Sequence, residues 1–164
     1  MSAQPAAEDA GAELLRRFFR RYAASAAVVT AQGDHPVGFT ATSLTSVSLD
    51  PPLLSFGIAT SASSWPVIER AEHFAAHLLG HGQEPIAALF ARHGADRFGP
   101  ATTWHPGPFG VPLLSGVLAW AVCRVIAQVP AGDHVIVLGE PVAVDHCSGT
   151  PLVHHNGGYR PLHS

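Results

Sequence analysis

The hydrophobic residues near the amino end of this chain recur at helical spacing. Between Glu13 and Tyr22 one face is apolar and the opposite face is basic, which predicts an amphipathic helix. The apolar face consists of Leu14, Leu15, Phe18, Phe19 and Tyr22, and the basic face of Arg16, Arg17, Arg20 and Arg21. We interpret the basic face as a solvated helix surface, with phosphate binding as the alternative.

Beyond residue 25 apolar and polar residues mostly alternate, which is typical of β-strands. The pattern predicts strands at 26–31, one long strand from Gly38 to the Pro51-Pro52 break, another strand after it, then strands at 73–79, 117–129, 133–144 and near 152–153 and 159. Helical spacing predicts short helices from Ser63 toward Arg70 and from Gln83 to Arg92. Residues 93–112 contain many glycines and prolines, so we predict a long loop there.

Six or so strands joined by tight turns, with only short helices, indicate a mainly β protein with an antiparallel barrel. The chain lacks the repeated strand-helix-strand pattern of a doubly wound nucleotide fold. Between 117 and 129 every odd-numbered residue is apolar, and we expect these residues to form one unbroken face. Residues 1–10 are small, polar and acidic, so we expect a disordered leader followed by a single domain over residues 11–164.

The composition bears on interfaces, partners and localisation. Of the 164 residues 47% are hydrophobic and only 13% are charged, so apolar area beyond the core is expected to lie in a subunit interface. The net charge of −3 gives no general attraction to nucleic acid or to an acidic membrane, and we expect neither partner. Two cysteines without a disulfide framework, and no signal peptide or membrane-spanning run, favour a cytoplasmic protein.

Two segments carry candidate binding chemistry. In the 38–58 stretch Thr40, Thr42, Ser46 and Ser48 share one parity, which gives a strand with a face of small hydroxyls. By itself this pattern fits a barrel strand with small side chains, and a structural role is as consistent with it as a functional one. The serines before Pro66 mark a helix start, where free amides suit either a phosphate or a plain N-cap.

The arginine and histidine residues are candidates for phosphate binding, metal binding or catalysis. All nine basic residues are arginine, so any phosphate charge must be met by arginine, hydroxyls or amides; Arg97 is one candidate. His73, His77 and His81 are four residues apart, but on a strand this spacing is too wide for one metal. We therefore expect solvated histidines and no metal site. His134, after a turn at Gly132-Asp133, is either structural or functional.

The order of these pieces resembles the flavin reductase-like family. The resemblance covers about residues 14–162 and is carried by GFTATS at 38–43, SVSLDPP at 46–52, SASSWP at 61–66, HF at 73–74, DRF at 96–98, GDH at 132–134, PLV at 151–153 and GY at 158–159. Members are homodimeric FMN-binding split barrels that serve as small components of two-component flavin monooxygenases. Thr42 and His77 stand where relatives often have asparagine.

The resemblance implies an NAD(P)H:flavin oxidoreductase that transfers hydride to FMN, with FAD as a possibility, and supplies reduced flavin to a partner monooxygenase. It places Phe39, Thr40, Ala41, Thr42 and Ser43 along the flavin, Ser61, Ser63 and Ser64 at its phosphate, Arg97 at the phosphate or the interface, His134 on the nicotinamide side and Tyr159 near the cofactor. The nucleotide is NADH or NADPH. Two alternatives stay open: a flavin carrier or sensor without nicotinamide turnover, and an enzyme that acts on an organic substrate with a retained flavin.

Overall fold

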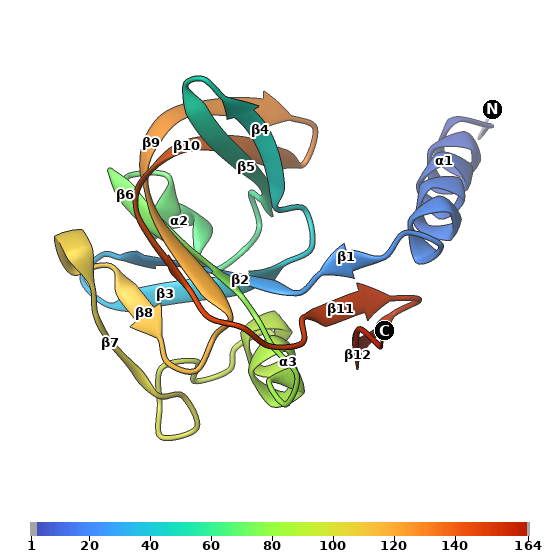
Figure 1. The fold of residues 1–164 in the computed structure, drawn as a ribbon. Helices are drawn as coiled ribbons and strands as arrows, with labels where there is room; N and C mark the ends of the chain where they lie inside the picture. The colour runs from blue at the N-terminus through green and yellow to red at the C-terminus, as the bar shows by residue number, and fades with distance from the viewer. Residues whose placement is uncertain (1–2, 164) are drawn as a thin grey trace.

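The computed structural model describes residues 3–163 and places an antiparallel barrel beside an outlying helix (Figure 1). The helical elements are α1 (Ala3–Arg20), α2 (Trp65–Ile68), α3 (Glu84–Ala91) and the 3₁₀ turn η1 (Pro108–Gly110). The strands are β1 (Ala24–Ser25), β2 (Ala27–Gln32), β3 (Pro36–Ala41), β4 (Thr45–Leu49), β5 (Pro52–Ala59), β6 (His73–Leu78), β7 (Trp104–Pro106), β8 (Pro112–Leu114), β9 (Ala119–Ala131), β10 (His134–His146), β11 (Leu152–His155) and β12 (Gly158–Pro161).

The barrel is one curled sheet whose two ends approach each other. Its strand order is β3-β2-β6-β9-β10-β5-β4, and every neighbouring pair is antiparallel. The curl brings β3, at one end of this order, into contact with β5 near the other end. We call the junction between β3 and β5 the seam. The mainly β, antiparallel barrel predicted from the sequence is confirmed.

The inside of the barrel is filled by aromatic and aliphatic side chains from most of its strands. Phe56 and Phe74 are fully buried at its centre, with ring centroids 4.9 Å apart in an edge-to-face arrangement. A second apolar cluster lies outside the barrel, where Phe90 of α3 packs beneath β2 and β3. Gly38 allows this contact, because a Cβ at that position would lie 2.9 Å from the Phe90 ring. Two cores therefore fix β3 from both sides.

Two predicted strands differ from the observed ones. The strand expected to run from Gly38 to the proline pair is interrupted, because residues 42–44 carry the chain from β3 to β4 at the other end of the sheet. The apolar face expected over 117–129 is only partly buried. Cys123 lies in the barrel core with Ala121 and Val125 packed against it, whereas Val129 is exposed. Val122, on the opposite face of β9, is also buried, because it packs in a separate cluster with Val111 and Leu113. The loop expected over 93–112 contains β7, η1 and the start of β8.

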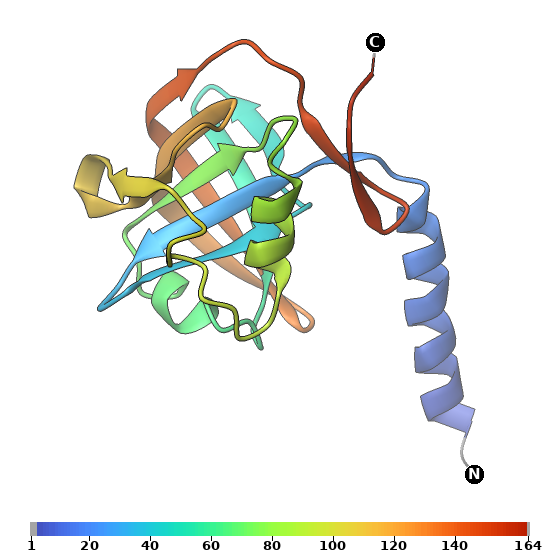
Figure 2. The same ribbon diagram turned by 90° about the horizontal axis from the view of Figure 1, so that it is seen from below.

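The amino-terminal segment also differs from its prediction. The backbone is helical from Ala3, in place of the disordered leader expected over residues 1–10; residues 1–2 lie outside the described residues. Figures 1 and 2 both show α1 projecting from the barrel, connected to it through β1, with a wide space between helix and sheet. No helix within residues 3–163 is both long and apolar enough to span a membrane.

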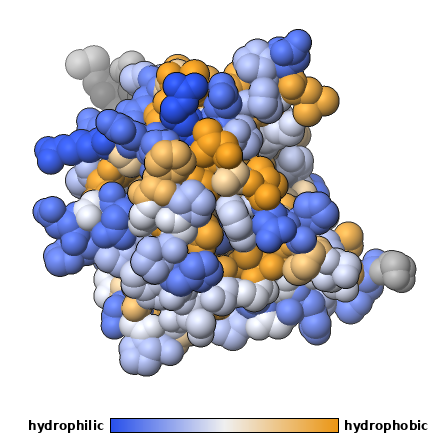
Figure 3. Space-filling model, turned by 60° about the vertical axis from the view of Figure 1, so that its left-hand side comes forward, coloured by the Kyte–Doolittle hydropathy of each residue, from blue (hydrophilic) through white to orange (hydrophobic). Residues whose placement is uncertain are grey.

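The surface retains much of the surplus apolar area that the composition predicts. Figure 3 shows hydrophobic side chains gathered across one face of the molecule and framed by polar ones. Large apolar side chains are also exposed on α1, β4, β9 and β10.

Candidate functional site

A pocket of about 320 Å³ lies at the seam of the barrel. It is lined by the end of β3 and the residues after it on one side, and by the end of β5, Ala62 and His134 on the other. Six predicted site residues line it together: Phe39, Thr40, Ala41, Thr42, Ser43 and His134. Curling of the sheet brings these residues together, because β10 pairs with β5 and β5 meets β3 across the seam.

The polar atoms that β3 offers to this pocket belong to its backbone. Among the described residues β3 is the end strand of the sheet and pairs only with β2, so alternate residues point their amide and carbonyl groups toward the seam. The Gly38 carbonyl points away from β2, since it accepts hydrogen bonds from Ser64 and Arg97. By the two-residue period of a strand, the backbone of Thr40 faces the same free edge.

The hydroxyls of residues 40–43 are less available than the alternating pattern predicted. Thr40 Oγ1 donates to the Ala87 carbonyl of α3 at 2.7 Å, so this hydroxyl fastens β3 to the helix. Ser43 Oγ accepts from the Gly57 amide at 2.8 Å and donates to its carbonyl at 3.3 Å, which ties residues 42–44 to β5. Thr42 is exposed, and no protein partner is seen for its hydroxyl within the described residues.

Gly57 keeps the middle of the pocket open. A Cβ built on it would lie 3.5 Å from Ser43 Oγ and 3.9 Å from His134 Cδ2, so its missing side chain would point into the space between them. Any larger side chain would fill the pocket. Sequence reasoning missed this residue because its neighbours across the seam are distant in the chain.

His134 begins β10 and is oriented by its neighbour. Its Nδ1 donates to Asp133 Oδ1 at 2.7 Å, and this bond holds the pKa of the Asp133 carboxyl below its usual range. The Asp133 carbonyl accepts from both the amide and the hydroxyl of Thr60, which fixes the turn against the chain after β5. Because Nδ1 is engaged and Cδ2 lies toward Gly57, the Nε2 edge of the ring is the one presented to the pocket.

A second pocket, of about 370 Å³, continues along β3 toward its start. Ser63, Ser64, Arg97 and Gly38 are among the residues that line it. Ser64 is buried and donates to the Gly38 carbonyl at 3.0 Å instead of capping α2, whereas Ser63 is exposed. The two pockets are neighbours, since Gly38 and Ser63 line one while the adjacent Phe39 and Ala62 line the other.

Arg97 supplies the positive charge of this second pocket. Its guanidinium donates to the carbonyls of Gly38 (2.6 Å) and Arg92 (3.0 Å), and desolvation lowers its pKa. Within residues 3–163 no carboxylate forms a salt bridge with it, and its buried Nε has no hydrogen-bond partner. A desolvated guanidinium with spare donors beside serine hydroxyls suits a phosphate group.

Two predicted residues lie apart from these pockets. Ser61 is exposed in the turn before α2 and lines neither of them. Tyr159 lies on β12, in the small sheet β1-β11-β12, where its ring packs against the second core and near His154 at 5.3 Å. Burial raises the pKa of the Tyr159 hydroxyl. Within one chain, Tyr159 therefore does not join the seam pocket.

The expectation of solvated histidines is wrong for His77, which is fully buried. Its Nδ1 donates to the Val28 carbonyl at 2.9 Å, and its Nε2 accepts from the Leu114 amide at 3.1 Å. Desolvation lowers its pKa to about 4, so this imidazole is a neutral link between β2, β6 and β8. The sequence signal for this role was weak, because the short strand β8, which supplies Leu114, was not predicted.

The fold is an antiparallel split barrel with two adjoining pockets along β3. Residues 19–163 match the model of the flavin reductase like domain. The chain therefore belongs to the flavin reductase-like family, and the resemblance inferred from its motifs is confirmed. The match spans nearly all of the described residues, including the outer sheet with Tyr159.

Named relatives agree with this assignment. The chain is 41% identical over 150 residues to the NADH:FMN oxidoreductase of Rhodococcus qingshengii, an alignment that covers 88% of this chain and 78% of the relative. The NADH:FAD oxidoreductase SgcE6 of Streptomyces globisporus C-1027, solved with NAD and FAD fragments, has a TM-score of 0.86 and 34% identity, covering 91% of each chain. BorF, the flavin reductase component of a bacterial two-component tryptophan halogenase, has a TM-score of 0.85 and 34% identity over 92% of this chain and 98% of BorF.

Proposed function

We propose that this chain is an NADH-dependent flavin reductase that uses the seam of its barrel to hold a flavin against a nicotinamide. The observation that carries the proposal is the convergence of six predicted site residues on one pocket. A second pocket directly beside it contains Arg97, a cation with no carboxylate partner in the described part of the chain. A flavin mononucleotide has a flat ring system and a phosphate. The seam pocket would hold the ring system, and the adjoining pocket with Arg97 would hold the phosphate.

The residues present fit such a ligand. The backbone edge at Thr40 and the exposed Thr42 would meet the polar rim of the ring, and the absence of a side chain at Gly57 leaves room for its face. Arg97 and Ser63 would hold the phosphate, where the buried Nε of Arg97 would gain a partner that the protein does not provide. Ser64 would act indirectly, by keeping Arg97 and β3 in place through the Gly38 carbonyl.

A bound flavin supplies the redox chemistry, accepting a hydride from the reduced nicotinamide. The contribution of the chain is to orient the rings and to exclude water between them. Asp133 holds the His134 ring so that Nε2 faces the pocket, where it can donate to or accept from the co-substrate. The step needs no general acid, and the pocket offers no paired carboxylates among its lining residues.

FMN is the favoured flavin, as in the Rhodococcus relative, and NADH the favoured nucleotide. We further propose that the chain acts as a cytoplasmic homodimer and passes reduced flavin to a separate monooxygenase component, since BorF is the reductase component of such a two-component system. The exposure of Thr42 and Ser43 favours a flavin that exchanges readily and serves as a substrate.

Loss of NADH absorbance in the presence of catalytic FMN tests the activity. We expect flavin-dependent turnover with NADH, slower turnover with NADPH, and reduction of FMN under anaerobic conditions. A protein that binds FMN but fails to oxidise either nucleotide would be a carrier or sensor. Turnover only after addition of an organic substrate would instead favour the enzyme with a retained flavin.

The variant Arg97→Met tests the phosphate pocket. We expect the KM for FMN to rise about 10- to 100-fold, because a charge-assisted contact to the phosphate is lost. Riboflavin has no phosphate, so its KM should change less than about twofold. Arg92→Met is the matched control, because only the backbone carbonyl of Arg92 contacts Arg97. An equal loss with both flavins would mean that Arg97 supports only the structure of β3.

The variant His134→Ala tests the nicotinamide side of the pocket. We expect a rise of about tenfold in the KM for NADH and less than a twofold change in the dissociation constant of FMN. The change in the KM for NADH must be compared with the change in the dissociation constant of FMN, because both ligands would bind at the seam and a general disturbance of the pocket would weaken both. Equal effects on NADH and FMN would place His134 against the flavin.

A further inference from the structure

The segment that carries Arg97 has little backbone structure of its own. Residues 92–103 form neither a helix nor a strand. In the part of the chain that the structure describes, the backbone hydrogen bonds of residues 93–103 lie on the carboxyl side of Phe98, at residues 99–103. Side-chain contacts are therefore needed to fix the backbone position from which Arg97 reaches the second pocket.

Phe98 is the side chain that anchors this segment. Its ring lies edge-to-face between two others, with its centroid 5.3 Å from that of Phe90 and 5.3 Å from that of Trp104. Phe98 and Trp104 are both partly buried against the second apolar cluster, to which Phe90 belongs. We call these three rings the aromatic row. Edge-to-face pairs have a preferred geometry, so the row fixes the course of the chain next to Arg97.

Both ends of the aromatic row are attached to the barrel. At one end Phe90 lies under β3, where its ring approaches Gly38, and the Gly38 carbonyl accepts from Arg97 at 2.6 Å. At the other end Trp104 pairs with Leu114 across β7 and β8, and the Leu114 amide donates to the buried histidine of β6. The row therefore holds the arginine in register with its hydrogen-bond acceptor and with the wall of the barrel.

The guanidinium of Arg97 retains a donor for a ligand. Its terminal nitrogens donate to the carbonyls of Gly38 and Arg92, whereas its buried Nε has no partner among the described residues. Arginine recognises a phosphate through N–H groups in a fixed planar arrangement, so a rotation of the guanidinium weakens the contact without removing the charge. Phosphate binding therefore depends on the orientation of Arg97 as well as on its charge.

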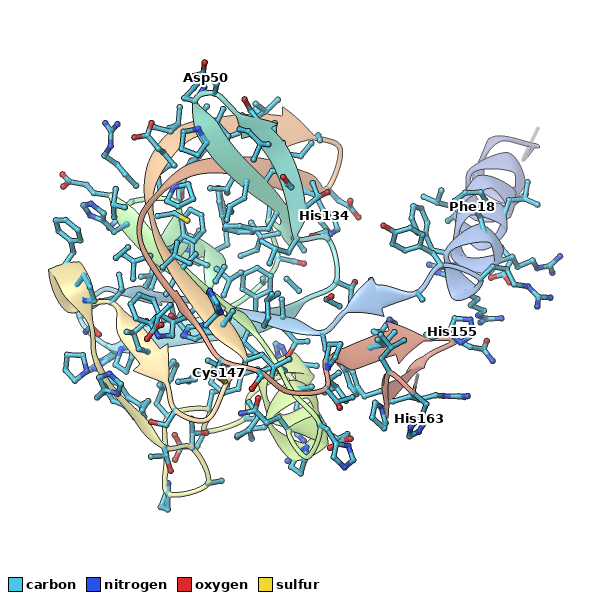
Figure 4. All side chains as sticks on the ribbon, in the orientation of Figure 1. Phe18, Asp50, His134, Cys147, His155 and His163 are labelled. Carbon is cyan, nitrogen blue, oxygen red and sulfur yellow. The ribbon has the colours of Figure 1, made fainter. Side chains whose placement is uncertain are left out.

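We propose that Phe98 and Trp104 are positioning residues, which hold Arg97 in the orientation that binds the phosphate of the flavin. The part of this inference that concerns phosphate rests on the proposed function, and the part that concerns the orientation of Arg97 does not. Trp104 lines neither the seam pocket nor the second pocket, so it acts through Phe98. Figure 4 shows His134 high in the barrel and Figure 1 shows α3 and β7 below it, so the row is separate from the proposed nicotinamide side.

The variant Trp104→Leu tests the inference, because it removes one ring of the aromatic row and changes no residue that lines either pocket. We expect the KM for FMN to rise about threefold to tenfold, a smaller loss than for Arg97→Met, since the charge is kept and only its orientation is disturbed. The KM for riboflavin, the KM for NADH and kcat should each change less than about twofold. Trp104→Phe keeps a ring in the row and should restore the KM for FMN to within about twofold of the wild type.

A double-mutant cycle separates positioning from a general effect on the fold. In the Arg97→Met background, Trp104→Leu should change the KM for FMN less than about twofold, because the side chain that Trp104 positions is no longer present. If circular dichroism shows that Trp104→Leu is unfolded, Trp104→Met is the second variant, since a methionine adapts to the vacated space but has no ring. The same results are expected of it.

Phe109→Leu is the control from the adjoining turn η1. Phe109 is 66% exposed and stacks on His73, outside the aromatic row, with ring centroids 3.8 Å apart. This variant should leave the KM for FMN unchanged. NMR relaxation of the Arg97 Nε–H group provides a readout without flavin. Its order parameter should be high in the wild type and in Phe109→Leu, and should fall in Trp104→Leu.

Several results would overturn the inference. An equal rise in the KM for FMN and for riboflavin with Trp104→Leu would mean that Trp104 supports only the fold. An unchanged order parameter of Arg97 would also overturn it, as would an effect of Trp104→Leu that persists at full size in the Arg97→Met background. If the order parameter falls but neither Trp104→Leu nor Arg97→Met changes the KM for FMN, the proposed phosphate site fails, while the positioning of Arg97 by the row stands.

Discussion

The pH dependence of stability should be governed in large part by one buried histidine. His77 is neutral in the folded protein because burial lowers its pKa from 6.5 to about 4. Its two hydrogen bonds require the neutral form, since Nε2 accepts from the Leu114 amide and would become a donor on protonation. In the unfolded chain the same imidazole binds a proton near its ordinary pKa of 6.5.

The sign and size of the effect follow from this difference. Between pH 6.5 and pH 4 the unfolded state binds a proton that the folded state does not, so acidification stabilises the unfolded state. The contribution of His77 is complete above pH 6.5 and is lost progressively as the pH falls to about 4. A shift of about 2.5 pKa units corresponds to about 3 kcal/mol, a large fraction of the stability of a domain of this size.

Urea unfolding followed by tryptophan fluorescence, repeated from pH 7.5 to pH 4, measures this term. His77→Gln is the informative variant, because a glutamine can still donate to Val28 and accept from Leu114 but cannot titrate. We expect its free energy of unfolding to fall by about 3 kcal/mol less than that of the wild type over this range. The exposed His105→Gln should follow the wild type. Identical slopes for wild type and His77→Gln would refute the reasoning.

Two further predictions concern the pocket and the thiols. Gly57→Val should raise the dissociation constant of FMN at least about tenfold with an unchanged circular dichroism spectrum, since its methyl groups would fill the seam pocket. Gly57→Ala should bind nearly normally, because its Cβ would make only ordinary contacts at 3.5 Å; normal binding by the valine variant would place the ligand elsewhere. In the native protein at pH 8, Cys147 is exposed whereas burial raises the pKa of Cys123 to about 12, so a thiol reagent should modify one cysteine per chain and two after unfolding. Modification of both cysteines at equal rates under native conditions would contradict the buried position of Cys123.

The alternation of apolar residues predicted most strands to within a few positions. A strand that packs one face on a core has apolar and polar residues in alternation, and this two-residue period is visible in the sequence. The prediction from alternating residues was wrong where contacts with distant segments change the burial or the course of a strand. In β9 Val122 lies on the face opposite to the core residues Cys123 and Val125, yet it is buried because Val111 and Leu113 pack over it, and nothing in the local sequence of β9 marks that contact. At 42–44 the hydroxyl-rich pattern continues unchanged while the chain leaves one end of the sheet for the other.

The candidate site was predicted as a list of residues but not as an arrangement. Thr40 shows the difference: its parity agreed with a ligand-facing hydroxyl, yet that hydroxyl bonds to α3, 47 residues away. Tyr159 and Ser61 came from the resemblance, and within one chain they lie away from both pockets. Their proposed roles therefore depend on the dimer or on movement of the turn before α2.

Strand periodicity, turn residues and ordered motifs are local properties, so an antiparallel barrel with the motifs of a flavin reductase could be predicted from the sequence. The groups that face the two pockets depend instead on tertiary contacts. Closure of the sheet brings Ser43 against Gly57 and sets His134 beside them, and packing of β8 over His77 makes that histidine neutral. These features depend on contacts between distant segments, and the periodicity of one segment contains no information about its partner across the seam.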